Sequence, residues 1–279
     1  MKIIDAGVHS WTAAAPDRPW MPGRVAHVEP PIGYEDLSRL MADAGVDRAV
    51  LIPPSWEGDR IDYSLEAAQK YPDRFAVMGR IPIDKPEGPQ MLETWKDHPG
   101  MLGVRLTFHH AWDTAWITDG TADWFWPAAE RLGIPVMMNA PTVLPAVGQV
   151  AERHPDLRLI IDHMGRTRGA KDEGLLADLQ DTIALAKYPN VHTKLTLAPE
   201  CSSDPYPYRS VHGAIRTLID AFTPRRCFWG SDLSVLLART DCTYPQSVTM
   251  FTEEMDFLDD DDLEWIMGRG LAECLPWPL

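Results

Sequence analysis

Three side chains that can transfer protons come directly after apolar runs that lie far apart in the chain. His9 follows "IIDAGV", His163 follows "LIID" and Asp232 follows "FWGS". An imidazole exchanges a proton near neutral pH, and a carboxylate in an apolar setting can have a raised pKa, so both groups suit general acid–base catalysis. If the three runs end at one place, these residues could form the catalytic part of an active site. The same three side chains could also hold a divalent metal.

Six other residues occupy positions from which they could bind a small substrate. Arginine binds a carboxylate through two parallel hydrogen bonds, lysine adds a point charge, and tryptophan offers a flat apolar wall for a planar ring. The six candidates are Arg105, Arg166, Asn139, Lys194, Trp11 and Trp56.

Several of these candidates also have a purely structural interpretation. Arg105 could form an ion pair with a buried carboxylate such as Asp5 or Asp162. Asp232 could cap the helix that follows it, and Lys194 could extend outward along its strand. Burying many polar groups at one place costs free energy at each of them. The whole set therefore favours a functional site more strongly than any single member does.

Strand-like and helix-like patterns alternate along the whole chain, which indicates how these residues are positioned. Apolar, β-branched runs predict eight strands, over residues 2–8, 48–53, 74–81, 102–108, 134–139, 157–162, 191–197 and 227–230. Stretches with helical periodicity lie between them, as at Val211, Ile215, Leu218 and Phe222. The pattern predicts an α/β protein, a (β/α)8 TIM barrel, in which the C-terminal strand ends share one face. A doubly wound open sheet is the alternative, but the sequence has no G-x-G-x-x-G phosphate loop.

Length and charge narrow the classes of partner. The chain has 279 residues, which predicts one domain over residues 1–279, and a net charge of −15. This acidic balance argues against nucleic acid or an anionic membrane as partner, and no run approaches a membrane span, which leaves a small-molecule substrate. Four cysteines without a C-x-x-C pair favour a reduced, cytoplasmic setting. A homodimer through the outer helices is a further expectation.

Five segments carry a resemblance to a known family. They are "IIDAGVH", "YPDRFAVMGRIPI", "GVRL", "LIIDHMGR" and "FWGSDL". In this order and spacing they resemble the amidohydrolase superfamily, in the branch that includes amino-carboxymuconate-semialdehyde decarboxylase and the 2-pyrone-4,6-dicarboxylate lactonases. The resemblance covers nearly the whole chain and implies a TIM-barrel hydrolase, with His9, His163 and Asp232 at its active site.

The sequence departs from the family pattern at two expected metal ligands. The family has I-D-x-H-x-H at strand one, whereas this chain has Gly7 in place of the first histidine. At strand five, where metal-dependent members have a further ligand, it has Asn139. Glycine is no ligand and an amide oxygen is a poor one for zinc. We therefore expect no metal cofactor, with zinc or manganese held by His9, His163 and Asp232 as the alternative.

These observations predict a metal-independent, lactonase-type hydrolase that acts on a small cyclic ester, such as a carboxylated or aromatic catabolite. Asp232 is the predicted general base, and His9 and His163 donate hydrogen bonds or protons. Two alternatives stay open at this point. One is a metal-dependent decarboxylase or hydrolase with an unusual ligand set. The other is a non-catalytic homologue that acts as a binding or partner subunit.

Overall fold

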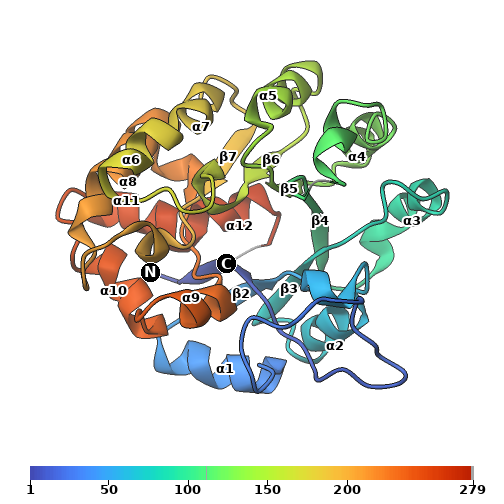
Figure 1. Cartoon of the computed structure of the whole chain (residues 1–279), viewed down its shortest axis with the longest axis horizontal. Helices are drawn as coiled ribbons and strands as arrows, with labels where there is room; N and C mark the ends of the chain where they lie inside the picture. The colour runs from blue at the N-terminus through green and yellow to red at the C-terminus, as the bar shows by residue number, and fades with distance from the viewer. Residues whose placement is uncertain (111, 278–279) are drawn as a thin grey trace.

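Eight short parallel strands form the centre of the protein (Figure 1). The structure is a computed structural model that describes residues 1–110 and 112–277. Each strand pairs in parallel with the next in sequence order, and the N–H of Ala6 donates to the carbonyl of Trp229, just past the last strand, which closes the ring. The strands are β1 (Ile4–Val8), β2 (Arg48–Leu51), β3 (Phe75–Gly79), β4 (Met101–Thr107), β5 (Val136–Asn139), β6 (Leu159–Ile161), β7 (Val191–Lys194) and β8 (Cys227–Phe228). The predicted TIM barrel is confirmed, with most strands shorter than the apolar runs.

Helices surround the ring of strands (Figure 1). In the described part of the chain they are α1 (Tyr34–Asp43), α2 (Asp62–Lys70), α3 (Gly88–Glu93), α4 (Phe125–Leu132), α5 (Leu144–Arg153), α6 (Asp172–Asp178), α7 (Gln180–Leu185), α8 (His212–Phe222), α9 (Leu233–Arg239), α10 (Tyr244–Thr252), α11 (Asp260–Glu264) and α12 (Gly270–Cys274). The first of them shows how pattern becomes structure. Tyr34, Leu37 and Met41 bury one face of α1, and Gly45 follows its end with a φ of 72°, which glycine adopts without steric cost.

The apolar core has two parts. One lies between the strands and the outer helices, where both elements bury their apolar faces. The other fills the inside of the barrel and includes Ile4, Val50, Met137, Ile160 and Phe228. Strand residues alternate between these two parts because successive side chains point to opposite faces. The part of the barrel where the strands begin is thus packed with apolar side chains, and polar groups lie where the strands end.

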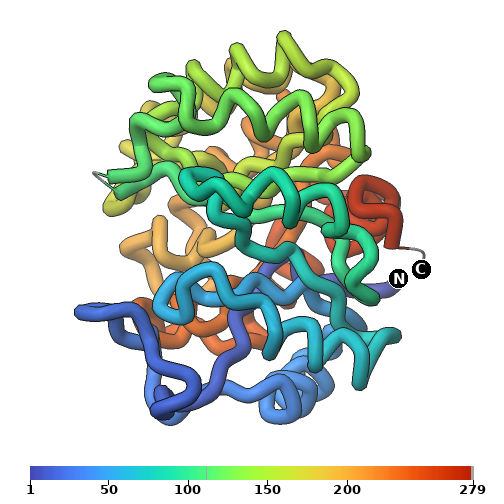
Figure 2. The backbone as a smooth tube through the Cα atoms, turned by 90° about the vertical axis from the view of Figure 1, so that its right-hand side faces the viewer, coloured from blue at the N-terminus to red at the C-terminus, as the bar shows by residue number. Residues whose placement is uncertain are grey.

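The termini and the first long loop lie at opposite ends of the barrel. Figure 2 shows both termini on one side, whereas the loop between β1 and α1 lies on the other. That loop therefore belongs to the end at which the strands finish, where TIM-barrel enzymes carry their active sites. In the described residues, no helix is long and apolar enough to cross a bilayer.

Candidate active site

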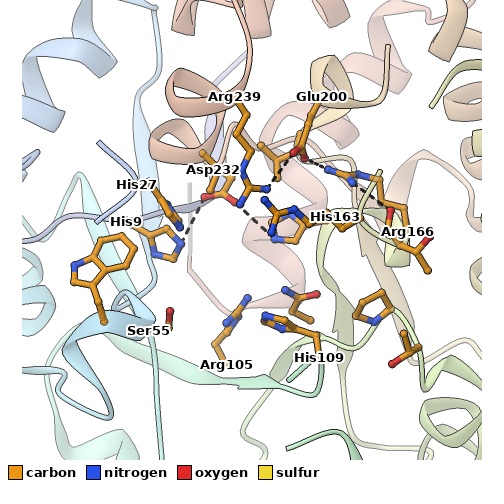
Figure 3. A pocket seen from close by; sticks show the side chains of 18 of the residues that line it. His9, His27, Ser55, Arg105, His109, His163, Arg166, Glu200, Asp232 and Arg239 are labelled. Carbon is orange, nitrogen blue, oxygen red and sulfur yellow. Dashed lines mark hydrogen bonds and ion pairs between the residues drawn. The ribbon is translucent and has the colours of Figure 1, made fainter. Parts of the chain in front are cut away.

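The residues after β1, β6 and β8 meet at one end of the barrel. Asp232 lies between two imidazoles: its Oδ1 is 3.5 Å from Nε2 of His9, and its Oδ2 is 3.7 Å from Nε2 of His163 (Figure 3). All three side chains border a cavity of about 430 Å³, which we call the reaction cavity. His9 and His163 are more than a hundred and fifty residues apart in the sequence, so only the closed barrel brings them together.

The backbone at two of these residues has an unusual conformation. His163 has a φ of 52° and Asp232 a φ of 48°, both in the left-handed region that favours glycine. Such a residue costs roughly 1–3 kcal/mol unless its surroundings hold it, and such strain clusters at functional sites. Here the N–H of His163 donates to Oγ1 of Thr196, and the N–H of Asp232 donates to the carbonyl of Gly7. The helix-cap alternative for Asp232 is wrong, because its side chain accepts no bond from the start of α9.

Hydrogen bonds orient both imidazole rings. Nδ1 of His9 lies 2.7 Å from the carbonyl oxygen of Ile52, which can only accept, so this nitrogen carries the proton. In neutral His9, Nε2 therefore presents a lone pair toward Asp232. Nδ1 of His163 lies 2.7 Å from Oγ1 of Thr196, the hydroxyl that already accepts the His163 N–H. If that hydroxyl donates its hydrogen to Nδ1, Nε2 of His163 carries the proton.

Burial moves the pKa values of this group in the direction that general base catalysis needs. Desolvation raises the pKa of Asp232 to about 6, against the opposing influence of His27, Lys194 and Arg105. Desolvation also lowers the pKa of His9 to about 3 and holds the pKa of His163 well below its ordinary value. At neutral pH both imidazoles are therefore neutral, and Asp232 is ionised but ready to take a proton.

A second aspartate, Asp162, has a different environment close to the cavity. Its Oδ2 accepts from Nε of Arg105 at 3.0 Å, and its Oδ1 lies 2.6 Å from Nζ of Lys194. Burial alone would raise the pKa of Asp162, but the ammonium of Lys194 and the guanidinium of Arg105 hold it well below the usual range. The ion pair that the sequence analysis offers as a structural role for Arg105 is thus present, with Asp162 rather than Asp5 as its partner. Arg105 nevertheless lines the reaction cavity, whereas Lys194 is not among the lining residues.

The other predicted binding residues differ in their relation to the cavity. Arg166, Asn139 and Trp56 line it. Arg166 pairs with Glu200, which also accepts from Nη1 of Arg239 at 3.0 Å, so this part of the wall already has its counter-charge (Figure 3). Trp11 lies outside the lining. It is buried and packs edge to face against Trp56, at 5.2 Å between ring centroids.

Further residues, outside the nine predicted site residues, also line the reaction cavity. His27, from the long loop after β1, has its ring 5.7 Å from that of His9, and its Nδ1 lies 2.9 Å from Oγ of Ser234. Desolvation lowers the pKa of His27 to about 4. Arg80 and His109 also line the cavity, after β3 and β4. Arg80 was detectable, because it lies at the end of a predicted strand, whereas the loop around His27 has no periodic pattern that would position it.

The residues present do not fit a divalent metal. A Cβ at Gly7 would lie 2.9 Å from Cδ1 of Ile52 and 3.0 Å from Nζ of Lys194. The ammonium of Lys194 therefore lies against the position from which the family's first histidine would project, and a positive charge there opposes a cation. Within residues 1–110 and 112–277, no group of three or more histidine, cysteine, aspartate or glutamate side chains is arranged to hold a metal ion.

Comparison with known proteins agrees with the fold. The Amidohydrolase family model matches residues 4–269. The chain is 31% identical over 242 residues to L-fucono-1,5-lactonase of Burkholderia ambifaria, covering 83% of this chain and 80% of that protein. It is 28% identical over 213 residues to 4-sulfomuconolactone hydrolase of Hydrogenophaga intermedia, covering 74% and 66% of the two chains. The chain therefore belongs to the amidohydrolase family and is a hydrolase.

A solved structure shows the same architecture. The crystal structure of an amidohydrolase from Burkholderia multivorans with bound zinc superimposes with a TM-score of 0.79 and 21% sequence identity, and the match covers all of both chains. The zinc is a feature of that crystal structure and is not carried over to the present chain.

Proposed function

We propose that this protein hydrolyses a small lactone without a metal ion, with Asp232 as general base. Two curated relatives are named as a lactonase and a muconolactone hydrolase, which supports a cyclic ester as substrate. One observation carries the assignment of the base. Oδ1 of Asp232 is buried at the reaction cavity and has no hydrogen-bond donor among the described protein groups, and burial raises the pKa of this carboxyl to about 6.

The first step is the activation of a water molecule. Oδ1 of Asp232 and Nε2 of His9 both accept hydrogen bonds and are 3.5 Å apart, so one water can donate a hydrogen to each of them. As the water oxygen forms a bond to the lactone carbonyl carbon, its proton moves to Asp232. A base with a pKa near 6 is ionised at neutral pH and still accepts this proton efficiently.

The second step opens the ring. Nε2–H of His163 donates to the oxyanion that forms on the carbonyl oxygen. When the carbonyl re-forms, the bond from the carbonyl carbon to the ring oxygen breaks. The proton on Asp232 passes to this leaving oxygen, directly or through His163. The product is a hydroxy acid, and Asp232 returns to its carboxylate form.

The cavity wall supports an anionic substrate although the whole chain is acidic. Its lining contains five arginines, Arg80, Arg105, Arg166, Arg168 and Arg239, but only two carboxylates among the described residues, Glu200 and Asp232. Arg105, Arg166 and Asn139 would hold polar groups of the substrate, and Trp56 would form an apolar wall beside its ring. Lys194 would act through Asp162 and set the position of Arg105.

The experiment is an assay of chelator-treated protein against sugar 1,5-lactones and carboxylated muconolactones, with proton release as the readout. Elemental analysis on the same sample measures its zinc and manganese. We expect hydrolysis of at least one lactone class by protein that holds far less than one metal ion per chain. Activity that disappears with the metal and returns with zinc or manganese would contradict metal independence. A protein inert toward all lactones would contradict the substrate class.

We further propose that the protein works in the cytoplasm. Its four cysteines, Cys201, Cys227, Cys242 and Cys274, are all buried and unbridged, which suits a reducing compartment. A homodimer stays a prediction, and measurement of the molar mass in solution tests it.

A further inference from the structure

A second hollow adjoins the reaction cavity. It has a volume of about 600 Å³, and we call it the side chamber. Ser55, Arg80 and Arg105 line both the reaction cavity and the side chamber. A molecule with its reacting ring near Asp232 could therefore extend past these three residues into the side chamber.

Apolar side chains form much of the far wall of the side chamber. Met21 comes from the loop after β1, and Trp112 and Trp116 come from the segment after β4. The two indole rings pack edge to face, with 5.2 Å between their centroids. Met21 and Trp112 are 51% and 58% exposed, so both present apolar surface at the side chamber. This wall suits a flat, apolar group, because aromatic faces and edges favour ring contacts.

Arg80 lies where the reaction cavity and the side chamber meet, and its guanidinium forms only some of the hydrogen bonds that it can donate. Its Nε donates to the carbonyl of Pro53 at 2.8 Å, and its Nη1 donates to Oγ1 of Thr107 at 3.2 Å. Among the described residues no carboxylate lies within ion-pair distance of it. Burial and the nearby guanidinium of Arg105 lower the pKa of Arg80 to about 9, which is the consequence of a cation without a close counter-charge.

The neighbouring groups do not supply the counter-charge that Arg80 lacks. Thr107 accepts from Arg105 at 2.6 Å as well as from Arg80, so the two cations meet at one hydroxyl. Asp162 is the only carboxylate that the described residues offer to Arg105, and it is shared with Lys194. Thus three cations adjoin one buried anion at this wall.

Three of the four carboxylates that line the side chamber, Glu57, Asp59 and Asp113, already face a basic side chain, and the fourth, Asp84, is not within ion-pair distance of Arg80. Asp59 pairs with Lys85 at 3.2 Å, and Oε1 of Glu57 lies 3.5 Å from Nη1 of Arg18. Asp113 is 2.7 Å from Nδ1 of His110. None of these groups lies within ion-pair distance of Arg80 in the described chain. A bound anion would complete the charge balance at the junction.

We propose that the side chamber is a substrate subsite for a flat apolar group, and that Arg80 binds a carboxylate of the same molecule at the junction with the reaction cavity. This inference rests on the proposed lactonase function and narrows its substrate to a carboxylated lactone with an aromatic or similarly planar apolar extension. Arg105 and Arg166, which already pair with Asp162 and Glu200, then contact other polar groups of the substrate along the path.

The test measures binding without turnover. Asp232→Asn protein is titrated calorimetrically with 3-phenylpropionate, with its neutral counterpart 3-phenylpropanol, and with acetate. We expect 3-phenylpropionate to bind at least about tenfold more tightly than either of the other two, because only it offers both the charge and the ring. Equal binding of the acid and the alcohol would overturn the role of Arg80, and this comparison needs no change at Arg80.

Two variants in the same background separate the two halves of the subsite. Arg80→Met should weaken the acid about tenfold to a hundredfold and leave the alcohol unchanged, since it removes a charged donor. Trp116→Ala should weaken both aromatic ligands about threefold to tenfold and leave acetate unchanged. Arg131→Met is the matched control, because Arg131 is exposed and pairs with Glu93 on the outer helices. Unchanged binding in folded Arg80→Met and Trp116→Ala protein would overturn the proposal.

Failure of this inference and failure of the proposed function are distinguishable. Selective binding of the aromatic acid without hydrolysis of any lactone would support the subsite and contradict the lactonase. Hydrolysis of lactones, together with equal binding of the aromatic acid, the alcohol and acetate, would support the lactonase and contradict the subsite.

Discussion

Asp162 and Asp232 follow β6 and β8, are both buried, and have opposite electrostatic environments. Asp162 contacts two cations, at 3.0 Å and 2.6 Å, and its pKa is held well below the usual range. Asp232 faces two imidazoles, at 3.5 Å and 3.7 Å, and its pKa is raised to about 6. Burial disfavours the carboxylate in both, so the contacts decide the outcome.

The comparison assigns different tasks to two residues of the same type. A buried carboxylate with two cationic partners is a fixed counter-ion, since taking its charge away leaves those cations unpaired. A buried carboxylate beside neutral rings can gain and lose a proton near neutral pH, as a general base must.

The largest effect is expected for Asp232→Asn. Loss of the base should lower kcat by about 10²–10⁴-fold, because an amide cannot take the proton from water. The matched variant Asp162→Asn should not mimic this effect in the fraction of protein that stays folded. Steady-state kinetics on folded samples measures both. Near-normal turnover by Asp232→Asn would remove this residue from the role of base.

Stability should respond in the opposite order. Asp162→Asn leaves Lys194 and Arg105 without their anion, and we expect a loss of about 3–5 kcal/mol in the free energy of unfolding. Urea denaturation followed by circular dichroism measures it at neutral pH. If Asp162→Asn protein were no less stable than Asp232→Asn protein, the ion pairs of Asp162 would not hold the barrel together.

For Asp232→Asn the sign is reversed. The folded-state pKa of Asp232, about 6, lies above its ordinary value of 3.8, so its contribution to stability is fully present below that ordinary value and is lost as the pH rises through 6. Above pH 6 the ionised carboxylate is a burden, and the amide should stabilise the protein by about 1–3 kcal/mol. Denaturation of Asp232→Asn protein and of the unchanged protein, at neutral pH and at about pH 4, checks this. An equal difference in the free energy of unfolding at the two pH values would contradict it.

The pH dependence of catalysis follows from the same pKa. Because only ionised Asp232 can act as base, log kcat/KM should rise by about one unit per pH unit below pH 6 and level off above it. Desolvation lowers the pKa values of both His9 and His163, so neither ring adds a step near pH 6. Initial rates in constant ionic strength buffers test this. A profile that is flat from about pH 4 to about pH 8 would contradict it.

The smallest effect concerns the space next to Lys194. A methyl group at Gly7 would meet Cδ1 of Ile52 and the ammonium of Lys194, so Gly7→Ala should cost about 1–3 kcal/mol of stability. Gly174→Ala is the control, because a Cβ at this position in α6 meets nothing within 4 Å. Equal stability of the two variants, by urea denaturation, would show that the Lys194 ammonium does not occupy the space beside Gly7.

Much of the fold was predictable from the sequence, because alternating apolar runs and helical periodicity are local signals. The rule that catalytic residues follow barrel strands also selects His9, His163 and Asp232 as candidates from the sequence alone, and the barrel brings these three together at one cavity. The predicted strands are too long, since apolar residues continue past the last ladder hydrogen bond, as at Pro53 and Leu197.

Other features depend on three-dimensional distances that no pattern contains. The choice of Asp162 over Asp5 as partner of Arg105 depends on which side chains point inward at the same height. Asp5 instead accepts hydrogen bonds from Ser231 and Tyr244. The closeness of Lys194 to Gly7 depends on the width of the barrel, and the position of His27 depends on how a long loop folds back.

The most direct test of the two-aspartate account is a titration of both carboxyl groups in one sample. Carbon-13 NMR of protein labelled at the aspartate carboxyl carbons, assigned with Asp162→Asn and Asp232→Asn, reports each protonation separately. The account predicts a midpoint near pH 6 for Asp232 and an Asp162 signal that stays in its ionised position down to about pH 4. An Asp232 midpoint at or below its ordinary value of 3.8, or an Asp162 that takes up its proton near neutral pH, would contradict it.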